Sequence, residues 1–445
     1  MKANRIIAGI MAVCVMGFGV PYVNTVVGNN STIMASAADY TEGTYEFLTY
    51  KNYGEYIEIS DCDSSAETVE IPVEIDDVPV TSIGSGAFRG CSALTSIIIP
   101  DSIIYIGGYA FSRTLWLEEK QKENPLVIVN GILVDGETCS GNVVIPDDVK
   151  IIGEYSFTGC ENLTSVTIPD SVTKIGDSAF ALCNGLTSIE IPDSVTSIGV
   201  KAFGYCENLS SITIPDGATD IGYSAFDGTL WIEEKRKENP LVIVNNILVD
   251  ATTCSGDVVI SDDVTSIGNF SFSYDKYIKS VTIPDSVKSI RDCAFFVCAN
   301  LKSVTILNPD CEIYDNSYVF SNVFANGFSG TIYGYDNSTA QAYAEKYGRN
   351  FVSLGTAPEK DNISLGDINN DGFIDSVDAT AVLIEYAQLS TTGNSTLTDE
   401  QKKVAEINGD GFIDSVDATN IMQYYAYLST GGTESIETFM SLLYK

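Results

Sequence analysis

Oxygen-bearing side chains recur at fixed intervals near the C-terminus, within residues 366–378. Positions 1, 3, 5, 9 and 12 of a twelve-residue stretch are held by Asp367, Asn369, Asp371, Asp375 and Asp378. Gly372 stands at position 6, where a glycine allows a sharp turn. A calcium ion takes about six to eight oxygen ligands in a flexible cage, so this spacing predicts a calcium site.

The same pattern returns 39 residues later, within residues 406–417. Its oxygen-bearing residues are Glu406, Asn408, Asp410, Asp414 and Asp417, with Gly411 at position 6. Residues 371–380 and 410–419 are identical. A solvated acidic turn explains one such stretch poorly and two very poorly, so we expect two Ca²⁺ sites.

The composition limits the possible functions. The chain has 445 residues, a formal net charge of −36 and no histidine. This length predicts two or more units. The acidic charge disfavours nucleic acid and anionic membranes as partners, and the lack of histidine excludes Ser-His-Asp, Cys-His and His-zinc chemistry.

The N-terminus is typical of a secretion signal. Lys2 and Arg5 precede the apolar stretch 6–20, and small residues at 35–37 predict cleavage near Ala37 or Ala38. We therefore expect residues 1–37 to be a signal peptide. No other stretch is long and apolar enough to span a membrane and no C-terminal wall-anchoring signal is evident, so the mature protein should be exported and soluble, without a membrane segment.

A repeat of 23 residues fills most of residues 38–354. An Ile-Pro-Asp element recurs with prolines 23 or 46 residues apart at Pro100, Pro146, Pro169, Pro192, Pro215 and Pro284, and Ser261 replaces proline once. Such a period predicts a β-rich solenoid. In the unit 163–180, residues 163–168 should form a strand that Pro169 ends, and Phe180 should enter the core.

A longer unit is nested in the array. Residues 114–130 recur as residues 229–245, and both copies hold a charged helical run (118–123 and 233–238) before a strand-like segment. We interpret these copies as irregular turns of the same stack. Their tryptophans, Trp116 and Trp231, could stack on sugar rings, but their identical places favour packing.

The array resembles the BspA-like leucine-rich repeats of bacterial surface proteins, through an IPDSV-x-x-IG-x-x-AF-x-x-C motif over most of residues 45–350. The resemblance implies a right-handed leucine-rich-repeat solenoid, for which we count about 11 turns. Residues 40–59 should cap its front, and a helix in 338–348, begun by Ser338 and ended by Gly348, should cap its back.

Ten cysteines remain after signal removal, and several occupy one equivalent place per turn, three residues after the repeated Phe: Cys91, Cys160, Cys183, Cys206 and Cys298. Disulfides are the usual expectation for an exported protein. The periodic placement favours a column of free, buried thiols. The many carboxylates of the array permit a glycosidase pair in principle, but most belong to the repeated Pro-Asp turn, so we expect no catalytic residue.

After a linker at 355–364, the unit 365–445 should be small and all-α. A helix is expected over 377–389, a matching helix over 416–428, and a third between them, begun by a capping box at Thr398 and Gln401 and running through Val404. No helix leads into the first loop, unlike an ordinary EF-hand.

These features resemble a type I dockerin over residues 365–428, including the aspartates Asp378 and Asp417 at position 12. The resemblance implies the ten side-chain ligands above, with backbone carbonyls from Phe373 and Phe412. Glu406 departs from the family's aspartate and could weaken or reshape the second site. The resemblance also implies binding to a cohesin domain of a scaffoldin. The implied contact face comprises Ser376, Val377, Leu383, Ile384 and Gln388, mirrored by Ser415, Val416, Met422, Gln423 and Tyr427.

Some of these apolar residues could instead be core. The repeated Ser-Val pair would allow a cohesin to bind in either orientation. We therefore expect a non-catalytic, extracellular cellulosome component whose array binds a protein or a polysaccharide. The alternatives are a dockerin-bearing enzyme of plant cell-wall polysaccharide degradation and a cell-surface adhesin.

Overall fold

The computed structural model describes residues 40–322, 327–358, 365–369, 373–393, 395–430, 432 and 434–443. The expected signal peptide at 1–37 and most of the expected linker lie outside this range. The chain divides into two compact units, Met1–Ser353 and Leu354–Lys445, each described here by itself.

A regular turn of the first unit has three sides, as residues 163–183 illustrate. Its first side is β13 (Leu163–Thr167), and its second is β14 (Lys174–Ile175). On the third side, the Phe180 N–H donates to Ala202 O of the next turn at 2.8 Å. Leu163, Ile175 and Phe180 are fully buried, which confirms the predicted solenoid turn.

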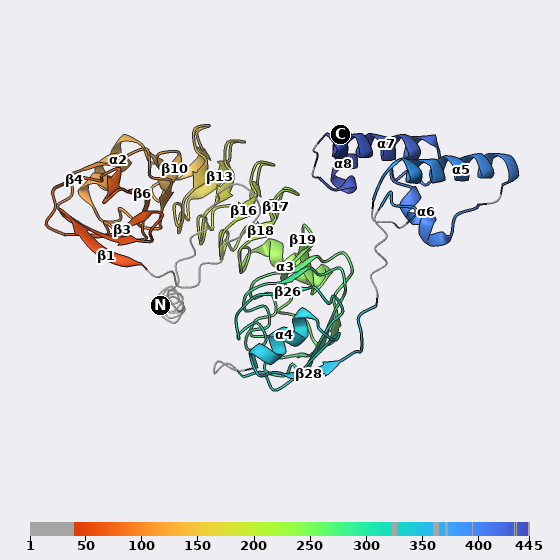
Figure 1. Ribbon diagram of the computed structural model, residues 1–445. Coiled ribbons are helices and arrows are strands. Elements are labelled where there is room, and N and C mark those ends of the chain that lie inside the picture. The colour runs from red at the N-terminus through yellow and green to blue at the C-terminus, as the bar shows by residue number, and fades with distance from the viewer. Residues whose placement is uncertain are drawn as a thin grey trace. The chain divides into compact units, whose positions relative to one another are not determined.

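Parallel strands line up along the first side (Figure 1), each about one repeat from the next except from β7 to β11 and from β17 to β21, which are two repeats apart. They are β4 (Thr68–Glu70), β7 (Ser96–Ile98), β11 (Gly141–Val144), β13, β15 (Ser188–Glu190), β17 (Ser211–Thr213), β21 (Gly256–Val259), β23 (Ile278–Ile283), β25 (Ser303–Ile306), β27 (Thr331–Gly334) and β28 (Asn350–Ser353). The register repeats with the sequence, so that Ser188 pairs with Ser211 and Ser280 with Ser303.

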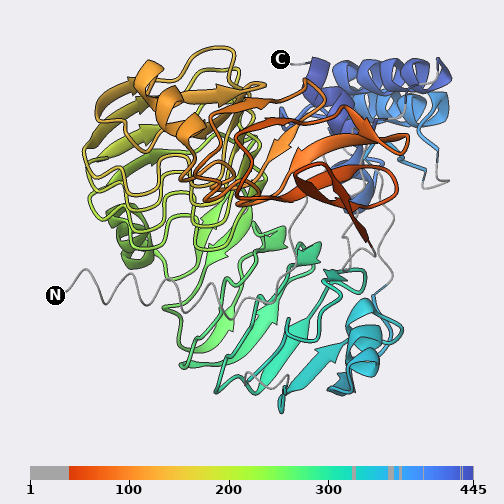
Figure 2. The ribbon, with the colours of Figure 1, turned by 90° about the vertical axis from the view of Figure 1, so that its left-hand side faces the viewer.

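The second side carries shorter strands, most of them two residues long. They are β6 (Val78–Ile83), β8 (Tyr105–Ile106), β10 (Ile132–Asp135), β12 (Ile151–Ile152), β14, β16 (Ser197–Ile198), β18 (Asp220–Ile221), β20 (Ile247–Asp250), β22 (Ser266–Ile267), β24 (Ser289–Ile290) and β26 (Glu312–Ile313). Figure 2 shows the strands of the later turns running side by side.

The two long units are turns of the same stack, as expected. Helices α2 (Leu115–Glu123) and α3 (Leu230–Glu238) take the place of the first-side strand. The backbone N–H of Trp116 donates to Leu94 O at 2.8 Å, and that of Trp231 donates to Leu209 O at 2.9 Å. Each helix is followed by a hairpin, β9 (Val127–Val129) with β10 and β19 (Val242–Val244) with β20. With the two helical turns included, the solenoid has about 13 turns, two more than expected.

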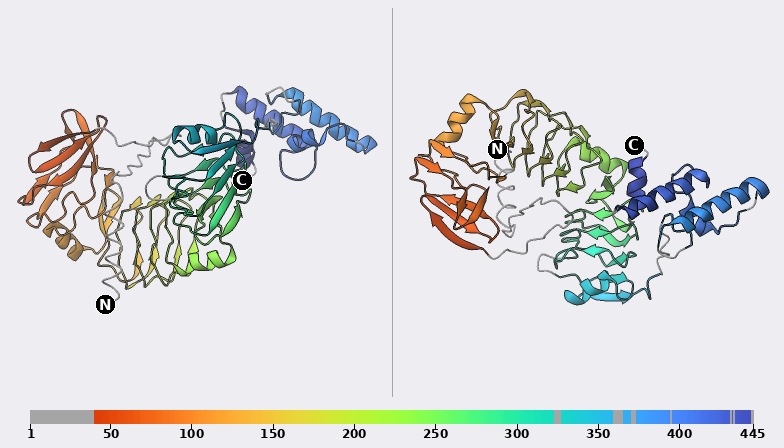
Figure 3. Two further views of the ribbon diagram at one scale, coloured as in Figure 1. Left: turned by 90° about the horizontal axis from the view of Figure 1, so that it is seen from below. Right: turned by 45° about the horizontal axis from the view of Figure 1, so that its top comes forward.

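Stacked phenylalanines run through the core of the array, whose successive turns can be followed in Figure 3. The ring of Phe203 lies 5.3 Å from that of Phe180 and 6.0 Å from that of Phe226, and both pairs are nearly parallel. The tryptophans also pack against phenylalanine rings but at a tilt, Trp116 at 4.7 Å and 53° from Phe111 and Trp231 at 5.0 Å and 59° from Phe226. Packing therefore accounts for both tryptophans.

The ten cysteines from Cys62 to Cys311 are buried free thiols, and the predicted column is confirmed. The thiol of Cys183 donates to Phe157 O at 3.0 Å, and Cys206 and Cys298 repeat this contact at 2.9 and 3.1 Å with the carbonyl 26 residues earlier. Burial raises the pKa of Cys254 to about 12, so its thiol stays protonated at neutral pH.

Both ends of the array are covered as the sequence predicts. At the front, β1 (Thr41–Tyr45), β2 (Leu48–Asn52) and β3 (Ile57–Cys62) form an antiparallel meander, and β3 joins β6, which also pairs with β5 (Glu74–Ile75). At the back lies α4 (Thr339–Lys346), whose N-cap Ser338 accepts from Gln341 N.

The second unit contains α5 (Ser376–Thr392), α6 (Asp399–Ala405), α7 (Ser415–Ser429) and α8 (Ile436–Leu443). Helices α5 and α7 lie side by side (Figure 1). The expected capping box of Thr398 and Gln401 begins α6. Helix α8 was not expected, although Ile436, Phe439, Met440 and Leu443 have helical spacing. Ile436 and Met440 enter the core of the unit.

Candidate functional site

The first acidic loop is tied together by its last carboxylate. Asp378 is fully buried, and its Oδ1 accepts from Ile368 N at 2.8 Å while its Oδ2 accepts from Asp375 N at 2.9 Å. Asp375 also accepts from Val377 N and thereby caps α5. Asp367 is buried as well, so positions 1 and 12 both lie inside the unit. The predicted ligand Asp371 lies outside the described residues.

The second loop repeats this arrangement. Asp417 is fully buried and accepts from Ile407 N and Asp414 N, each at 2.9 Å. Glu406 Oε1 and Asn408 Oδ1 both accept from Asp410 N at 2.9 Å, so the side chains of positions 1 and 3 turn toward one point. At position 6, Gly411 has a φ of 82°, the conformation for which glycine was expected.

The buried aspartates are held by backbone N–H groups of their own loops. Burial raises the pKa of Asp378 and of Asp417, and the hydrogen bonds from the loop backbone oppose that shift. Each carboxylate closes a capping box at the start of its helix. The loop and the first helical turn are therefore one structure, and whatever orders the loop also fixes the helix.

The residues fit a calcium ion by the chemistry of their donors, all of which are oxygen atoms at the required intervals. Within the part of the chain that the structure describes, no three His, Cys, Asp or Glu side chains form a group that could hold a metal. Phe373 and Phe412 are 72% and 70% exposed, so they are not core residues. The ligating role of their backbone carbonyls stays a prediction.

The outer faces of α5 and α7 carry the predicted contact residues. Leu383, Ile384 and Met422 expose between 42% and 53% of their surface, so they are not core residues. The core positions are instead Val382 and Ile421, which are fully buried. Val377 and Val416 are exposed at the beginning of each helix, beside Ser376 and Ser415. Equivalent positions of the two helices thus form two similar exposed faces.

The faces differ at their C-terminal ends. Gln388 and Tyr427 hold equivalent positions and are both half-buried. The ring of Tyr427 lies 5.1 Å from that of Phe439, which belongs to α8. Helix α8 therefore makes the second face unlike the first, a difference that sequence reasoning missed.

One further pair of equivalent residues anchors the segment that follows each helix. Glu385 is fully buried and accepts from Thr396 N at 2.7 Å and from Leu397 N at 3.2 Å, as well as from the hydroxyls of Ser395 and Thr396. Its counterpart Tyr424 donates its hydroxyl to Glu434 O at 2.8 Å. Burial opposes ionisation of Glu385, but these hydrogen bonds outweigh it and hold its pKa below the ordinary value.

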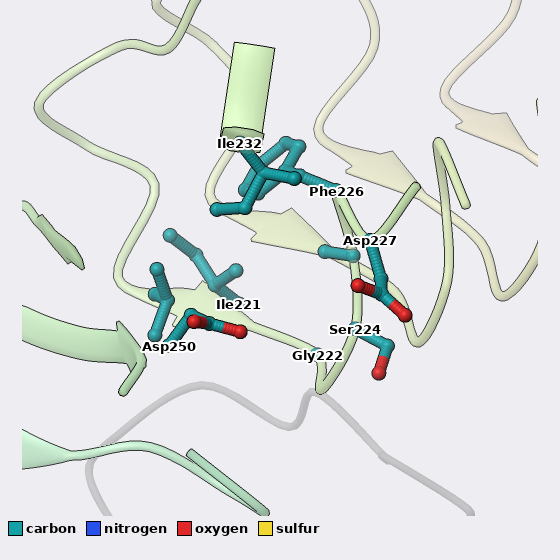
Figure 4. A pocket seen from close by; sticks show the side chains of 9 residues that line it. Ile221, Gly222, Ser224, Phe226, Asp227, Ile232 and Asp250 are labelled. Atoms are coloured by element: carbon teal, nitrogen blue, oxygen red, sulfur yellow. The ribbon is translucent and has the colours of Figure 1, made fainter. Parts of the chain in front are cut away.

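In the array, a small pocket beneath α3 brings two carboxylates near each other (Figure 4). Asp227 and Asp250 line it, and Arg236 pairs with both, at 3.2 and 2.7 Å. The equivalent pocket beneath α2 has Gln121 donating to Asp135 at 2.8 Å. These contacts tie each helix to the following hairpin, so the carboxylates have structural partners rather than the arrangement of a catalytic pair.

Among the described residues, no helix is both long and apolar enough to cross a membrane. Comparison with family models matches the BspA type leucine rich repeat region, in six copies, to residues 61–128, 137–248 and 250–330. A second model, the dockerin type I domain, matches residues 365–425. A search of curated proteins found no match.

Similar solved structures are bacterial leucine-rich-repeat proteins. A leucine-rich repeat protein from Bacteroides ovatus is 22% identical, with 66% of this chain and 69% of that chain covered and a TM-score of 0.28. A leucine rich cell surface protein from Faecalibacterium prausnitzii is 21% identical, with 73% and 97% covered and a TM-score of 0.26. The T. pallidum leucine rich repeat protein is 20% identical, with 65% and 98% covered and a TM-score of 0.21.

Proposed function

Because the chain belongs to the BspA type leucine-rich-repeat family and ends in a type I dockerin domain, we propose that it is a non-catalytic, exported cellulosome component. Neither matched model describes a catalytic domain. In this proposal the dockerin attaches the protein to a cohesin of a scaffoldin, which could itself lie at the cell surface. The array presents a binding surface to a protein or a polysaccharide.

The observation that carries the proposal is the pair of equivalent loop-helix segments. Each has an acidic loop closed by a buried aspartate, followed by a helix with an exposed face that begins with Ser-Val. A cohesin would contact these faces at the residues predicted from the sequence. The near symmetry of the segments would permit two orientations, and the different surroundings of Gln388 and Tyr427 would favour one of them.

Calcium would be held at two sites. The first would use Asp367, Asn369, Asp371, Asp375 and Asp378 with the Phe373 carbonyl, and the second Glu406, Asn408, Asp410, Asp414 and Asp417 with the Phe412 carbonyl. The ion would supply positive charge that offsets the repulsion among these carboxylates. Because each loop is continuous with the start of its helix, metal affinity would appear as folding free energy of the whole unit.

Titration calorimetry of the full chain with a cohesin module tests the proposal. We expect binding in calcium, and a loss of at least about a hundredfold in affinity with a chelator or in the double variant Asp367→Ala, Asp410→Ala, because the helices lose their ordered loops. The matched control is Asp170→Ala with Asp193→Ala, two exposed aspartates of the array. Unchanged affinity in chelator would refute calcium-dependent docking.

A further inference from the structure

Two neighbouring two-stranded sheets on the first side of the array, β11 with β13 and β15 with β17, carry a regular set of hydroxyl groups. The outward positions of β11, β13, β15 and β17 are here called the hydroxyl face. Those of β13, β15 and β17 hold serine and threonine apart from the exposed Glu190, because the repeat places Ser-x-Thr or Ser-x-Glu on the first side of these turns, whereas β11 presents Asn142 and the exposed Val144. The exposed hydroxyl residues are Ser165, Thr167, Ser188, Ser211 and Thr213. The residue between each pair points inward, as Ile189 and Ile212 do.

Within each pair of strands, the geometry of a sheet sets the spacing of the hydroxyls. Neighbouring strands of a sheet lie about 4.8 Å apart, and alternate residues of one strand about 6.7 Å apart. At the β11 edge, Asn142 Oδ1 accepts from Ser165 Oγ at 2.8 Å and from Thr164 Oγ1 at 3.0 Å. These bonds show that a hydroxyl of this face reaches an acceptor above the neighbouring strand.

The remaining hydroxyls of the face have no such neighbour. Among the described residues, no hydrogen bond is made by the side-chain hydroxyls of Thr167, Ser188, Ser211 or Thr213. A hydroxyl both donates and accepts, so each could bond to a ligand of either kind. The face therefore presents donors and acceptors to solvent, where a ligand could replace their bound water.

The chemistry of the face selects the class of partner. Protein interfaces rely on buried aromatic and Arg anchors, and the outward positions of these four strands contain neither. They contain no lysine either, and their one charged residue is the exposed Glu190, so an anionic ligand would meet a negative charge on a protein of net charge −36. A neutral polymer with its own repeating hydroxyls needs neither an aromatic or Arg anchor nor a positive counter-charge.

We propose that the hydroxyl face binds a neutral polysaccharide chain, whose hydroxyls would exchange hydrogen bonds with those of successive turns. The inference rests on the proposed function, since it names the ligand of the array. Later turns repeat the pattern with Ser280, Thr282, Ser303 and Thr305. Those residues are half-buried, and Ser280 already donates to Asp257 at 2.7 Å, so the hydroxyl face is the better exposed surface.

The test uses the full chain in depletion assays with crystalline cellulose and in affinity electrophoresis with xylan and mannan, with polygalacturonate as an anionic comparison. We expect retention by at least one neutral polymer and none by polygalacturonate. The variant Thr167→Val, Ser188→Ala, Ser211→Ala, Thr213→Val removes the hydroxyls while valine keeps the strand preference. We expect its affinity to fall at least tenfold, with an unchanged melting temperature.

The matched control is Thr173→Val with Thr196→Val, two exposed threonines elsewhere in the same turns, which should bind like the parent chain. The proposal is overturned if no neutral polymer is retained, if the four-residue variant binds as well as the parent, or if polygalacturonate is preferred. Cohesin affinity is measured on the same samples. Intact cohesin binding with absent glycan binding would reject this inference alone, whereas absent cohesin binding would reject the docking proposal.

Discussion

The two units of this protein place carboxylates in opposite environments. In the array, the half-buried Asp177 lies one turn from Glu154, and its partial burial, followed by the charge of Glu154, raises its pKa to about 6. In the dockerin unit, Glu385 is fully buried, yet hydrogen bonds from Ser395, Thr396 and Leu397 hold its pKa below the ordinary value. Repetition places like residues above one another, which suits apolar side chains and penalises charged ones.

The two units therefore depend on different interactions for their stability. A solenoid turn buries its apolar residues only against its neighbours, so its stability is a sum of similar contacts. The dockerin unit is small, and its core is supplemented by carboxylates that bind backbone N–H groups at the loops and at Glu385. The stability of the array should therefore depend mainly on packing. The stability of the dockerin unit should depend mainly on charge and on bound metal.

Removing a stacked ring from the array should have the largest effect on stability. Phe203 is fully buried between Phe180 and Phe226, so Phe203→Ala should lower the free energy of unfolding of the array by about 3–5 kcal/mol. Thermal unfolding monitored by calorimetry measures this loss, and calcium-dependent cohesin binding should not change. Tyr277→Ala, which removes a ring that is 68% exposed, is the control. Equal losses in the two variants would contradict the stacking model.

Replacing the buried glutamate of the dockerin unit should have an intermediate effect. Glu385→Gln keeps the size but removes the charge from its hydrogen bonds, which should cost about 1.5–3 kcal/mol. Because the folded-state pKa is lowered, the carboxylate stabilises the fold fully above the ordinary glutamate pKa of about 4.3 and less as the pH falls through the lower folded value.

Urea unfolding at several pH values would detect this dependence. The parent and Glu385→Gln should differ at pH 7 and converge in strong acid, whereas Glu437→Gln, at an exposed site on α8, should match the parent throughout. A difference between parent and Glu385→Gln that did not change with pH would show that shape, and not charge, holds the connector to α5.

The sequence predicts local features of both units well, because they depend on short-range chemistry. The proline spacing defines the turns, Ser338 and Thr398 begin their helices as expected, and the cysteine spacing predicts the thiol column. These signals need no knowledge of distant contacts. In each case the backbone preference of a residue type, or its periodic place in the sequence, is sufficient to predict the local structure.

Features that depend on packing between distant segments could not be predicted in the same way. Val382, Leu383 and Ile384 are consecutive and apolar, and only the contact of α5 with α7 decides that Val382 is buried. Burial of Glu385 depends on the path of the connector, and the covering of Tyr427 depends on where α8 lies. Nothing in the spacing of α5 or α7 carries that information.

The smallest effect should come from neutralising the stacked carboxylate of the array. Asp177 Oδ1 accepts from Val200 N at 2.8 Å, and asparagine retains that acceptor. The folded-state pKa is raised, so the aspartate is tolerated below its unfolded value of about 3.9 and destabilises the array as the pH rises to about 6 and beyond. Because Asp177 is partly exposed, Asp177→Asn should raise the free energy of unfolding by only about 1 kcal/mol at pH 8 and by nearly nothing at pH 4.

Thermal unfolding of Asp177→Asn at pH 4, 6 and 8 would separate repulsion from other causes. The increase in stability of Asp177→Asn over the parent should appear between pH 4 and 6. It should then level off, since the carboxylate of the folded parent is ionised above that range. Asp170→Asn, at an exposed aspartate of the preceding Pro-Asp turn, should show no such rise. If Asp177→Asn instead destabilised the array at pH 8, the carboxylate charge would be favourable there, and the contrast with Glu385 would fail.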